Sequence, residues 1–182
     1  MADASLTTQR DPLAAWRKLD AVSRMIARLT SQKAALTAAA ERLVGIDGMV
    51  LEVGLGKGRT WDLLGHLLPE RRRLALDREV HAPAALRPAA DQLMLGELSE
   101  LLPRLARDMP GQVALAHVDC GGEGRAADAA FDAWLPAALH PLLAAGAVVA
   151  QDRPRGHPRW RALPAPAGMT VFPYYLYRKD AT

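Results

Sequence analysis

The 182-residue sequence has little cysteine and few aromatic residues, and it contains no long apolar run. Its single cysteine, Cys120, excludes an internal disulfide framework and any zinc site made of cysteines alone, and it favours a reducing, cytoplasmic location. No segment approaches the ~20 uninterrupted apolar residues that a membrane span requires, so no membrane partner is expected. The segment from Met1 to Asp11 is polar and partly acidic, which predicts no secretory signal.

A large excess of charge of one sign is missing as well. Lysine and arginine together number 23 and the acids number 20, so the formal net charge of +3 does not indicate a nucleic-acid partner. The composition, 50% hydrophobic and 24% charged, is that of an ordinary globular protein, and the length predicts one domain.

Residues 12–44 predict a helical N-terminal extension, which we place at residues 1–45. Apolar residues recur there at spacings of three and four, and four of them repeat at every seventh position: Val22, Leu29, Leu36 and Leu43. Such a narrow stripe is typical of a coiled-coil seam, so we expect a homodimer or higher oligomer assembled partly through this helix. The alternative is a helix that packs on its own sheet as a lid. We expect any division into two helices at Thr30–Ser31, and Gly45 to end the segment.

From residue 46 onward, short apolar segments alternate with helical ones. Strands are expected at 49–53, 74–76, 92–95, 112–118 and 147–151, and helices at 59–68, 98–109 and 125–145. This alternation predicts a parallel sheet covered on both faces. Two further short strands, 169–171 and 174–178, predict an edge hairpin. The expected fold is α/β, a Rossmann-like, doubly wound, mostly parallel sheet with a C-terminal antiparallel hairpin and an N-terminal helical extension.

Acidic residues and glycines collect at the ends of the expected strands. They are Glu52, Gly54, Gly56 and Gly58 at the first strand, then Asp77, Glu97, Asp119 and Asp152 at the following four. In an open parallel sheet, ligands bind beyond the carboxyl ends of the strands. Loops are polar in any protein, so one such residue indicates little, but their register on five consecutive strands favours a ligand site.

The spacing of the glycines separates the candidate cofactors. A nicotinamide-dinucleotide site would read G-x-G-x-x-G, whereas this loop reads G-x-G-x-G, so a nicotinamide-dependent oxidoreductase is the less favoured alternative. A phosphate-binding P-loop needs Ser or Thr after Gly-Lys, but Gly58 follows Lys57. Alternate glycines let the backbone turn tightly and approach a ligand closely. The Glu52 carboxylate suits an ammonium group, and Asp77 suits a ribose.

The segment Glu52-Val-Gly-Leu-Gly-Lys-Gly58 resembles the first motif of the class I S-adenosylmethionine-dependent methyltransferases, an acid followed by alternate glycines. The short chain with its helical extension is similar to a small bacterial family of predicted methyltransferases. The resemblance implies that residues 46–182 form a domain that binds S-adenosyl-L-methionine. The implied contacts are Gly54, Gly56 and Gly58 at its methionine part, Glu52 at its amino group, Asp77 at its ribose, Gly96 and Glu97 at its adenine, and also Arg78 and Asp119.

The resemblance also implies methyl transfer to a small-molecule acceptor. Segments 117–119 and 147–152 are similar to small-molecule O-methyltransferases, and Asp119 or Asp152 would be the general base. Metal-dependent relatives carry Asp-Asn after the fifth strand, but Arg153 stands in place of the asparagine here, so no metal is expected. A non-catalytic dimer that binds the same cofactor is the alternative.

An arginine-rich segment follows the fifth expected strand. Arg153, Arg155, Arg159 and Arg161 lie within nine residues, with His157 among them. Guanidinium groups suit carboxylates and phosphates, so we expect this segment to steer an anionic metabolite toward the site. The alternative is a solvated loop in an arginine-rich chain. Cys120 is expected to be a small buried thiol and not a nucleophile.

Overall fold

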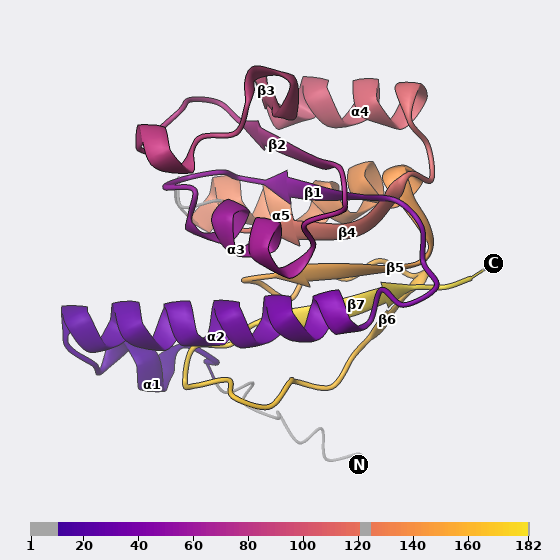
Figure 1. The fold of residues 1–182 in the computed structure, drawn as a ribbon. Helices are drawn as coiled ribbons and strands as arrows, with labels where there is room; N and C mark the ends of the chain where they lie inside the picture. Colours follow the sequence, from indigo (N-terminus) through magenta and orange to yellow (C-terminus); the bar gives the residue numbers. More distant parts are fainter. Residues whose placement is uncertain (1–10, 121–124, 182) are drawn as a thin grey trace, which may run out of the picture.

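The computed structural model describes residues 11–120 and 125–181 (Figure 1). The helices are α1 (Ala14–Arg17), α2 (Ala21–Glu41), α3 (Arg59–Leu67), α4 (Leu98–Asp108) and α5 (Arg125–Leu139). The strands are β1 (Met49–Val53), β2 (Arg73–Asp77), β3 (Leu93–Leu95), β4 (Val113–Val118), β5 (Leu143–Gln151), β6 (Trp160–Ala162) and β7 (Tyr175–Lys179). Short 3-10 turns are η1 (Ala84–Leu86), η2 (Ala90–Gln92) and η3 (His140–Leu142). Within the described ranges, no helix has the length and apolar character to cross a membrane.

The strands form one seven-stranded sheet in the order β3-β2-β1-β4-β5-β7-β6. Strands β1 to β5 pair in parallel, whereas β7 runs antiparallel to both of its neighbours, β5 and β6. The order reverses between β1 and β4, so the ends of these two strands, at Val53 and Val118, flank the switch point of the sheet. The expected fold class is confirmed.

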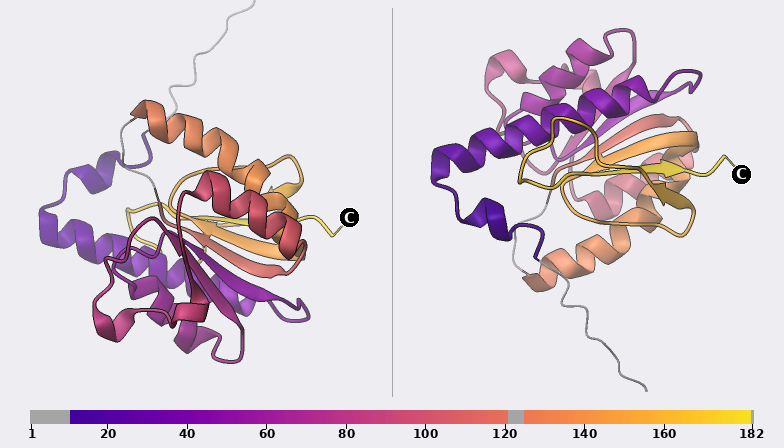
Figure 2. Two further views of the ribbon diagram at one scale, coloured as in Figure 1. Left: turned by 90° about the horizontal axis from the view of Figure 1, so that it is seen from above. Right: turned by 90° about the horizontal axis from the view of Figure 1, so that it is seen from below.

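Two apolar layers cover the sheet because successive strand residues point to opposite faces. Leu51 and Val53 pack with α4 and α5, whereas Val50 packs with α2 and α3 on the other face. Figures 1 and 2 show the same arrangement, with α4 and α5 on one side of the sheet and α2 on the other. Every β1 side chain is buried, as expected for a central parallel strand.

Helix α2 begins at Ala21 because Asp20 caps it, accepting a hydrogen bond of 2.9 Å from the Ser23 backbone N–H. The helix runs unbroken through Thr30 and Ser31, so the expected division there is wrong, and the chain divides between α1 and α2 instead. Ser31 is fully buried inside the helix, and its hydroxyl accepts a 2.9 Å hydrogen bond from the Thr170 N–H. Packing against a distant segment therefore keeps this part of α2 helical.

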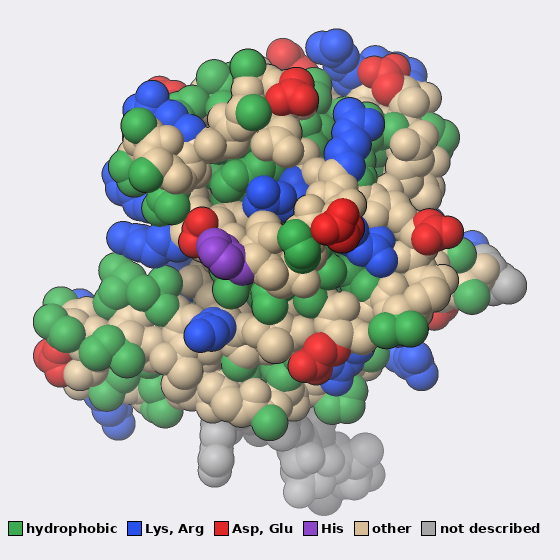
Figure 3. Space-filling model, in the orientation of Figure 1, with side chains coloured by type: hydrophobic (Ala, Val, Ile, Leu, Met, Phe, Trp, Pro, Cys, Tyr) green, Lys and Arg blue, Asp and Glu red, His purple; other side chains and the backbone are tan. Residues whose placement is uncertain are grey.

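The expected heptad stripe separates into two parts. Leu36 and Leu43 are buried on the sheet of their own chain, as in the lid alternative, but Val22 is 68% exposed and neighbouring Ile26 is 60% exposed. The difference arises because the N-terminal half of α2, together with α1, projects beyond the carboxyl ends of the strands (Figures 1 and 2). Figure 3 shows hydrophobic side chains gathered on this projecting half. A homo-oligomer formed through the helix stays a prediction.

Two C-terminal expectations are wrong. The hairpin joins β7 to residues 160–162, not to 169–171, because Trp160 is 7% exposed and its indole donates to His140 Nδ1 at 3.1 Å. Segment 169–171 instead packs on α2 through the Thr170 hydroxyl, which donates to the Ala27 carbonyl at 2.8 Å. Helix α5 ends at Leu139 and β5 starts at Leu143, because Pro141 falls in a 3-10 turn.

Candidate functional site

The loop between β1 and α3 is built from glycines that no other residue could replace without strain. Gly54, Gly56 and Gly58 have φ values of 92°, 50° and 75°. A Cβ at Gly54 would lie 2.7 Å from the Asp119 carbonyl oxygen, and one at Gly58 would lie 2.6 Å from the Leu86 carbonyl oxygen. At Gly56 nothing lies within 4 Å. The loop is therefore packed tightly on two sides and open at Gly56.

Asp77 ends β2 beside the open face of this loop. Its Oδ2 accepts the Gly56 N–H at 2.9 Å, and its Oδ1 accepts the Arg78 N–H at 2.7 Å. A carboxylate can accept about four hydrogen bonds, so Asp77 retains acceptor capacity after holding the backbone. Asp77 is also partly exposed to solvent. It can therefore accept hydrogen bonds from a ligand without breaking any bond of the fold.

The residues that follow β3 lie beside Asp77, at the carboxyl ends of the parallel strands. The Gly96 N–H donates to the Asp77 carbonyl oxygen at 3.0 Å, which ties the ends of β2 and β3 together. Glu97 is the N-cap residue of α4, although its side chain makes no capping bond. Both Glu97 and Arg78 are exposed. The residues expected around the ribose and the adenine thus lie on adjoining segments.

Glu52, by contrast, lies inside the protein, beneath the glycine loop. Its carboxylate is completely buried: Oε1 accepts the Thr60 hydroxyl at 2.5 Å, and Oε2 lies 2.8 Å from His117 Nδ1. Burial alone would lower the pKa of His117, but the Glu52 carboxylate, with Asp119 and Asp152 farther away, raises it above its ordinary value. His117 Nε2 in turn bonds the Tyr174 hydroxyl. Burial raises the pKa of Tyr174 well above 10, which keeps its hydroxyl protonated.

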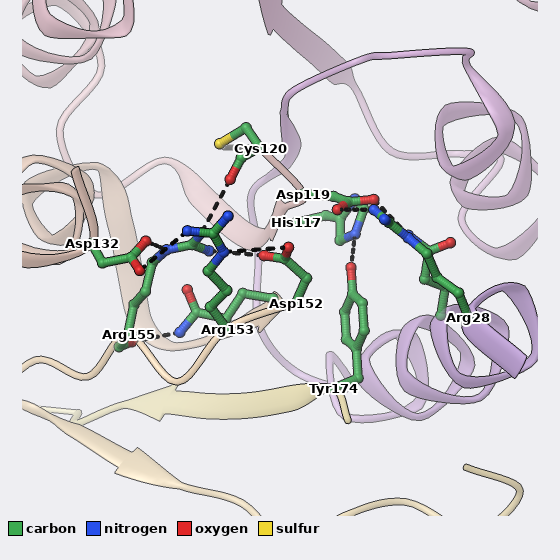
Figure 4. Close-up of polar contacts among 11 residues, drawn as sticks. Arg28, His117, Asp119, Cys120, Asp132, Asp152, Arg153, Arg155 and Tyr174 are labelled. Atoms are coloured by element: carbon green, nitrogen blue, oxygen red, sulfur yellow. Dashed lines mark hydrogen bonds and ion pairs between the residues drawn. The ribbon is translucent and has the colours of Figure 1, made fainter. Parts of the chain in front are cut away.

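Asp119, at the end of β4, is held by two side chains of α2. Arg28 Nη2 donates to its Oδ1 at 2.5 Å, and Gln32 Nε2 donates to its Oδ2 at 2.6 Å (Figure 4 shows the Arg28 contact). Arg28 and Gln32 are four residues apart and so share one helix face. The sequence analysis missed both residues. Their spacing was visible in the sequence, but nothing there linked that face to Asp119.

Asp152, after β5, is held by arginines as well. Its Oδ1 accepts Arg155 Nη1 at 3.0 Å, and its Oδ2 lies 3.9 Å from Arg153 Nε. Arg155 also donates through Nε to Asp132 Oδ1 at 2.5 Å and through Nη2 to the Cys120 carbonyl at 3.1 Å (Figure 4). Burial and the nearby Asp119 raise the pKa of Asp152 above its ordinary value, against the opposing effect of the two arginines.

The expectation for the arginine-rich segment is wrong at Arg155, whereas steering by its more exposed members stays a prediction. Arg155 is only 2% exposed and serves as an internal clamp, while Arg161 lies on β6 opposite Arg178. His157 stacks on His140 with ring centroids 4.1 Å apart, on the segment that leads into β6. Its pKa is lowered by burial and by Arg159 and Lys179. Arg153 remains beside Asp152, and Arg28 of α2 supplies a guanidinium that the sequence analysis did not anticipate.

Cys120 is half-buried instead of fully buried as expected, and its pKa agrees with the expectation that it is not a nucleophile. Burial raises its pKa to about 12, against a smaller opposing effect of Arg155, so the nucleophilic thiolate is absent at neutral pH. Among residues 11–120 and 125–181, no three His, Cys, Asp or Glu side chains gather closely enough to hold a metal ion.

A tight glycine loop, a ribose-compatible carboxylate and a switch point lie on one sheet edge, and the comparison with known proteins agrees with them. Residues 18–179 match the S-adenosyl-L-methionine methyltransferase family. The chain belongs to this family. S-adenosyl-L-methionine is therefore the cofactor of this methyltransferase, and the class I resemblance read from the glycine motif is confirmed. The residues present fit that cofactor, because the loop is open at Gly56 and Asp77 keeps unused acceptor sites.

Solved structures extend this comparison. The methyltransferase is 29% identical to an S-adenosyl-L-methionine methyltransferase from Silicibacter pomeroyi DSS-3, with a TM-score of 0.83 and coverage of 90% of this chain and 100% of that one. A cofactor-bound protein from MTB is 17% identical, with a TM-score of 0.57 and coverage of 98% and 94%. A protein from Corynebacterium glutamicum is also 17% identical, with a TM-score of 0.56 and coverage of 96% and 92%. The last two show the shared fold alone. No match was found among curated proteins.

Proposed function

We propose that this methyltransferase methylates an oxygen atom of a small molecule that carries an anionic group. The observation that carries the proposal is the order of charges at the ends of β4 and β5. The Arg28 side chain is 37% exposed against 16% for its partner Asp119, and Arg153 is 26% exposed against 14% for Asp152. The guanidinium groups thus lie outside the carboxylates. An arriving molecule meets hydrogen-bond donors with positive charge, which favours an anion.

Arg28 has donors to spare for such an anion. Among the described residues, its guanidinium makes one hydrogen bond, to Asp119, out of the five that it can donate. Both Asp119 oxygens already accept hydrogen bonds from α2. We therefore assign Arg28 to acceptor binding and Asp119 to holding Arg28. The latter replaces the role of general base that the sequence suggested for Asp119.

We assign the role of general base to Asp152. Among the described residues, the contact of its Oδ2 is the Arg153 ion pair at 3.9 Å, which leaves room for a hydrogen bond from a substrate hydroxyl. The raised pKa of Asp152 also makes its carboxylate a stronger base than an ordinary aspartate. The cofactor supplies a methyl group activated on a sulfonium. Asp152 would accept the proton that the hydroxyl loses when its oxygen takes the methyl group.

We assign cofactor binding to the half of the edge formed by β1, β2 and β3. Gly54, Gly56 and Gly58 would surround the methionine part, and Asp77 would accept hydrogen bonds from the ribose hydroxyls. Arg78, Gly96 and Glu97 would lie along the adenine. Glu52 is wholly buried, so we infer that it supports the glycine loop from beneath instead of contacting the cofactor's amino group directly.

The test is to incubate the protein with methyl-labelled S-adenosyl-L-methionine and a low-molecular-weight metabolite extract, followed by anion-exchange separation. We expect label in anionic small molecules, and none with the Asp77→Ala variant. Label only in neutral or cationic products would contradict the anionic acceptor. A complete absence of label, with the cofactor product still bound, would favour the non-catalytic alternative.

We also infer that the projecting half of α2 contributes to a homodimer, since Val22, Met25 and Ile26 are 68%, 48% and 60% exposed there. Light scattering of the Val22→Asp, Ile26→Asp double variant tests this inference, with a monomer as the expected result. An unchanged mass would exclude the helix as an interface. Deleting the extension up to Gly45 is a poor test, because Leu36 and Ala39 belong to the core.

A further inference from the structure

Four charged residues form a closed ring at the end of β5. Arg155 donates through Nε to Asp132 Oδ1 at 2.5 Å and through Nη1 to Asp152 Oδ1 at 3.0 Å. Arg153 closes the ring on its other side, because its Nη1 donates to Asp132 Oδ2 at 3.4 Å and its Nε lies 3.9 Å from Asp152 Oδ2 (Figure 4). Two guanidinium groups thus alternate with two carboxyl groups, so each acid of the ring is paired with both arginines.

The two arginines of this ring lie at different depths. The Arg155 side chain is 1% exposed, whereas the side chains of Arg153 and Asp152 are 26% and 14% exposed. A buried guanidinium is costly unless it is paired and its donors are used. Arg155 meets that condition, because its third nitrogen, Nη2, donates to the Cys120 carbonyl at 3.1 Å. Its guanidinium also lies over the ring of Phe131, 5.7 Å from the ring centroid, so it is fixed from several directions.

The backbone of Arg155 is fixed as well. Its N–H donates to the Arg153 carbonyl at 2.9 Å, and its carbonyl accepts a hydrogen bond from the Gln151 side chain, which is 1% exposed. Through its side chain, Arg155 joins Asp132 on α5 to the ends of β4 and β5. A group held at both its backbone and its guanidinium has little freedom, so its bond to Asp152 Oδ1 restricts where that carboxyl group can lie.

We propose that Arg155 is a positioning residue for methyl transfer, which holds Asp152 by Oδ1 and leaves Oδ2 at a fixed place for the acceptor hydroxyl. This inference rests on the proposed role of Asp152 as general base. A base must lie within hydrogen-bond reach of the proton that it accepts, so a small displacement of Asp152 lowers the rate. The positive charge of Arg155 also favours the deprotonated form of Asp152, which is the form that can accept a proton.

Other charged or titratable groups interact with Asp152, and a change at Arg155 leaves all of them in the chain. They are Arg28, His117, Asp119, Cys120, Arg153, Tyr174 and Tyr175. Burial and Asp119 raise the pKa of Asp152, whereas Arg155 and Arg153 lower it. Replacing Arg155 by a neutral residue should therefore raise the pKa of Asp152 further.

The first experiment needs no acceptor. The ¹³C resonance of the Asp152 carboxyl group, identified by its absence in Asp152→Asn, is titrated with pH in the wild type and in Arg155→Gln. We expect the midpoint to move to higher pH by about one unit or more, because a cation in direct contact is removed. The matched control is Arg104→Gln on α4, which removes an exposed arginine 3.7 Å from Asp108 and should leave the midpoint unchanged. An unchanged midpoint in Arg155→Gln would overturn the proposal.

The second experiment separates position from charge and uses a milder variant. Arg155→Lys keeps the positive charge but cannot bond Asp132, Asp152 and the Cys120 carbonyl through one planar group. With an acceptor found in the labelling screen, we expect kcat to fall about tenfold to a hundredfold, with the affinity for S-adenosylhomocysteine unchanged. The ¹³C midpoint of Asp152 should stay near its wild-type value in this variant.

The outcomes of the second experiment distinguish this inference from the proposed function on which it rests. A wild-type kcat in Arg155→Lys, with Asp152→Asn inactive, would overturn the positioning role alone. A wild-type kcat in Asp152→Asn would instead overturn the assignment of the base. Loss of S-adenosylhomocysteine binding in Arg155→Lys would show that Arg155 serves the stability of the whole domain, and this result too would overturn the positioning role.

Discussion

Asp77 and Asp119 stand at equivalent places, each at the end of a strand flanking β1, yet their surroundings are opposite. Asp77 holds two backbone N–H groups and keeps acceptor capacity facing a tight, open loop. Both carboxylate oxygens of Asp119 accept hydrogen bonds, one from Arg28 and one from Gln32. The Asp152 carboxylate is likewise paired with an arginine, Arg153, that is more exposed than it is. One half of the edge therefore offers acceptors, and the other presents donors with positive charge.

The difference teaches that a strand end determines where a carboxylate lies but not what it can do. Whether a carboxylate can accept hydrogen bonds from a ligand depends on which other side chains of the protein already bond to it. In the part of the chain that the structure describes, the hydrogen bonds of the Asp77 carboxylate come from backbone N–H groups. Asp119, by contrast, is bonded by Arg28, which is 91 positions away, and Asp152 by Arg155, which is three positions away. On this basis we separate a cofactor half, at β1 to β3, from an acceptor half, at β4 and β5.

The largest expected effect is on the cofactor half. Asp77→Ala should weaken S-adenosylhomocysteine binding severely, because a hydrogen bond to a charged group is worth about 1.5–3 kcal/mol, or roughly tenfold to a hundredfold in affinity for each ribose hydroxyl. Titration calorimetry measures the loss, and Glu79→Ala, an exposed acid two residues away, is the matched control. Equal affinity in the wild type and Asp77→Ala would remove Asp77 from the site.

The next prediction tests whether Asp152, in the acceptor half, acts as a general base or only holds Arg155 in place. Asp152→Asn should lower kcat by about 10²–10⁴, the range of general-base catalysis, with cofactor affinity unchanged. Asp132→Asn is the matched control because Asp132 also holds Arg155, at 2.5 Å, without facing the acceptor side in our assignment. Both are assayed with an acceptor found in the labelling screen. Similar losses in the two variants would show that Asp152 serves only to hold Arg155.

Local patterns accounted for most of the fold. Sequence patterns predicted the five parallel strands, most clearly β1 and β4, because burial on both faces leaves an apolar run that is recognisable in sequence. It failed at β6, since residues 160–162 and 169–171 are equally short and apolar. What decides between them is the Trp160 contact with His140, 20 residues away, and the Thr170 contact with α2, 143 residues away.

The site divides in the same manner. The glycine loop and Asp77 could be predicted because their chemistry is local: spacing, positive φ and strand ends. The partners of Asp119 could not, because no short-range pattern connects a residue on α2 to one after β4. The arginine-rich segment misled at Arg155 for the same reason. Its residues are neighbours in sequence, but Arg155 turns inward to Asp132 and Asp152, away from any ligand.

A smaller effect tests the assignment of Arg28 to the acceptor. Arg28→Ala should raise KM for the anionic acceptor about tenfold to a hundredfold, the value of one charged hydrogen bond, with a small effect on kcat and on cofactor affinity. The KM of Arg28→Lys should lie between those of the wild type and Arg28→Ala, since lysine keeps the positive charge but lacks the paired N–H donors of a guanidinium group. Arg24→Ala, which removes a cation lying over Trp16 one helical turn earlier, is the control. A loss of cofactor affinity in Arg28→Ala as large as in Asp77→Ala would contradict the separation of a cofactor half from an acceptor half.

The smallest expected effect concerns the buried histidine that lies between the two halves. His117 contacts the Glu52 carboxylate and the Tyr174 hydroxyl, and these and the more distant carboxylates of Asp119 and Asp152 act on its pKa, which is raised in the folded protein. A raised folded-state pKa stabilises the protein fully below the unfolded value near 6.5, and this contribution is lost as pH rises through the folded value.

The contribution of His117 to the free energy of unfolding of the wild type should therefore fall as pH rises above about 6.5, by about 1.4 kcal/mol for each unit of upward shift. The folded-state pKa values of His140 and His157 are lowered instead, so these two residues act in the opposite direction near pH 6.5. The raised pKa of Cys120 adds a fall of its own as pH approaches the ordinary thiol value near 8.5, so the effect of His117 is read as the difference between the wild type and His117→Gln below that pH. Urea denaturation at several pH values measures the fall, and His117→Gln should remove most of it, whatever its own stability. An identical slope in the variant would mean that His117 does not titrate between the two halves of the site.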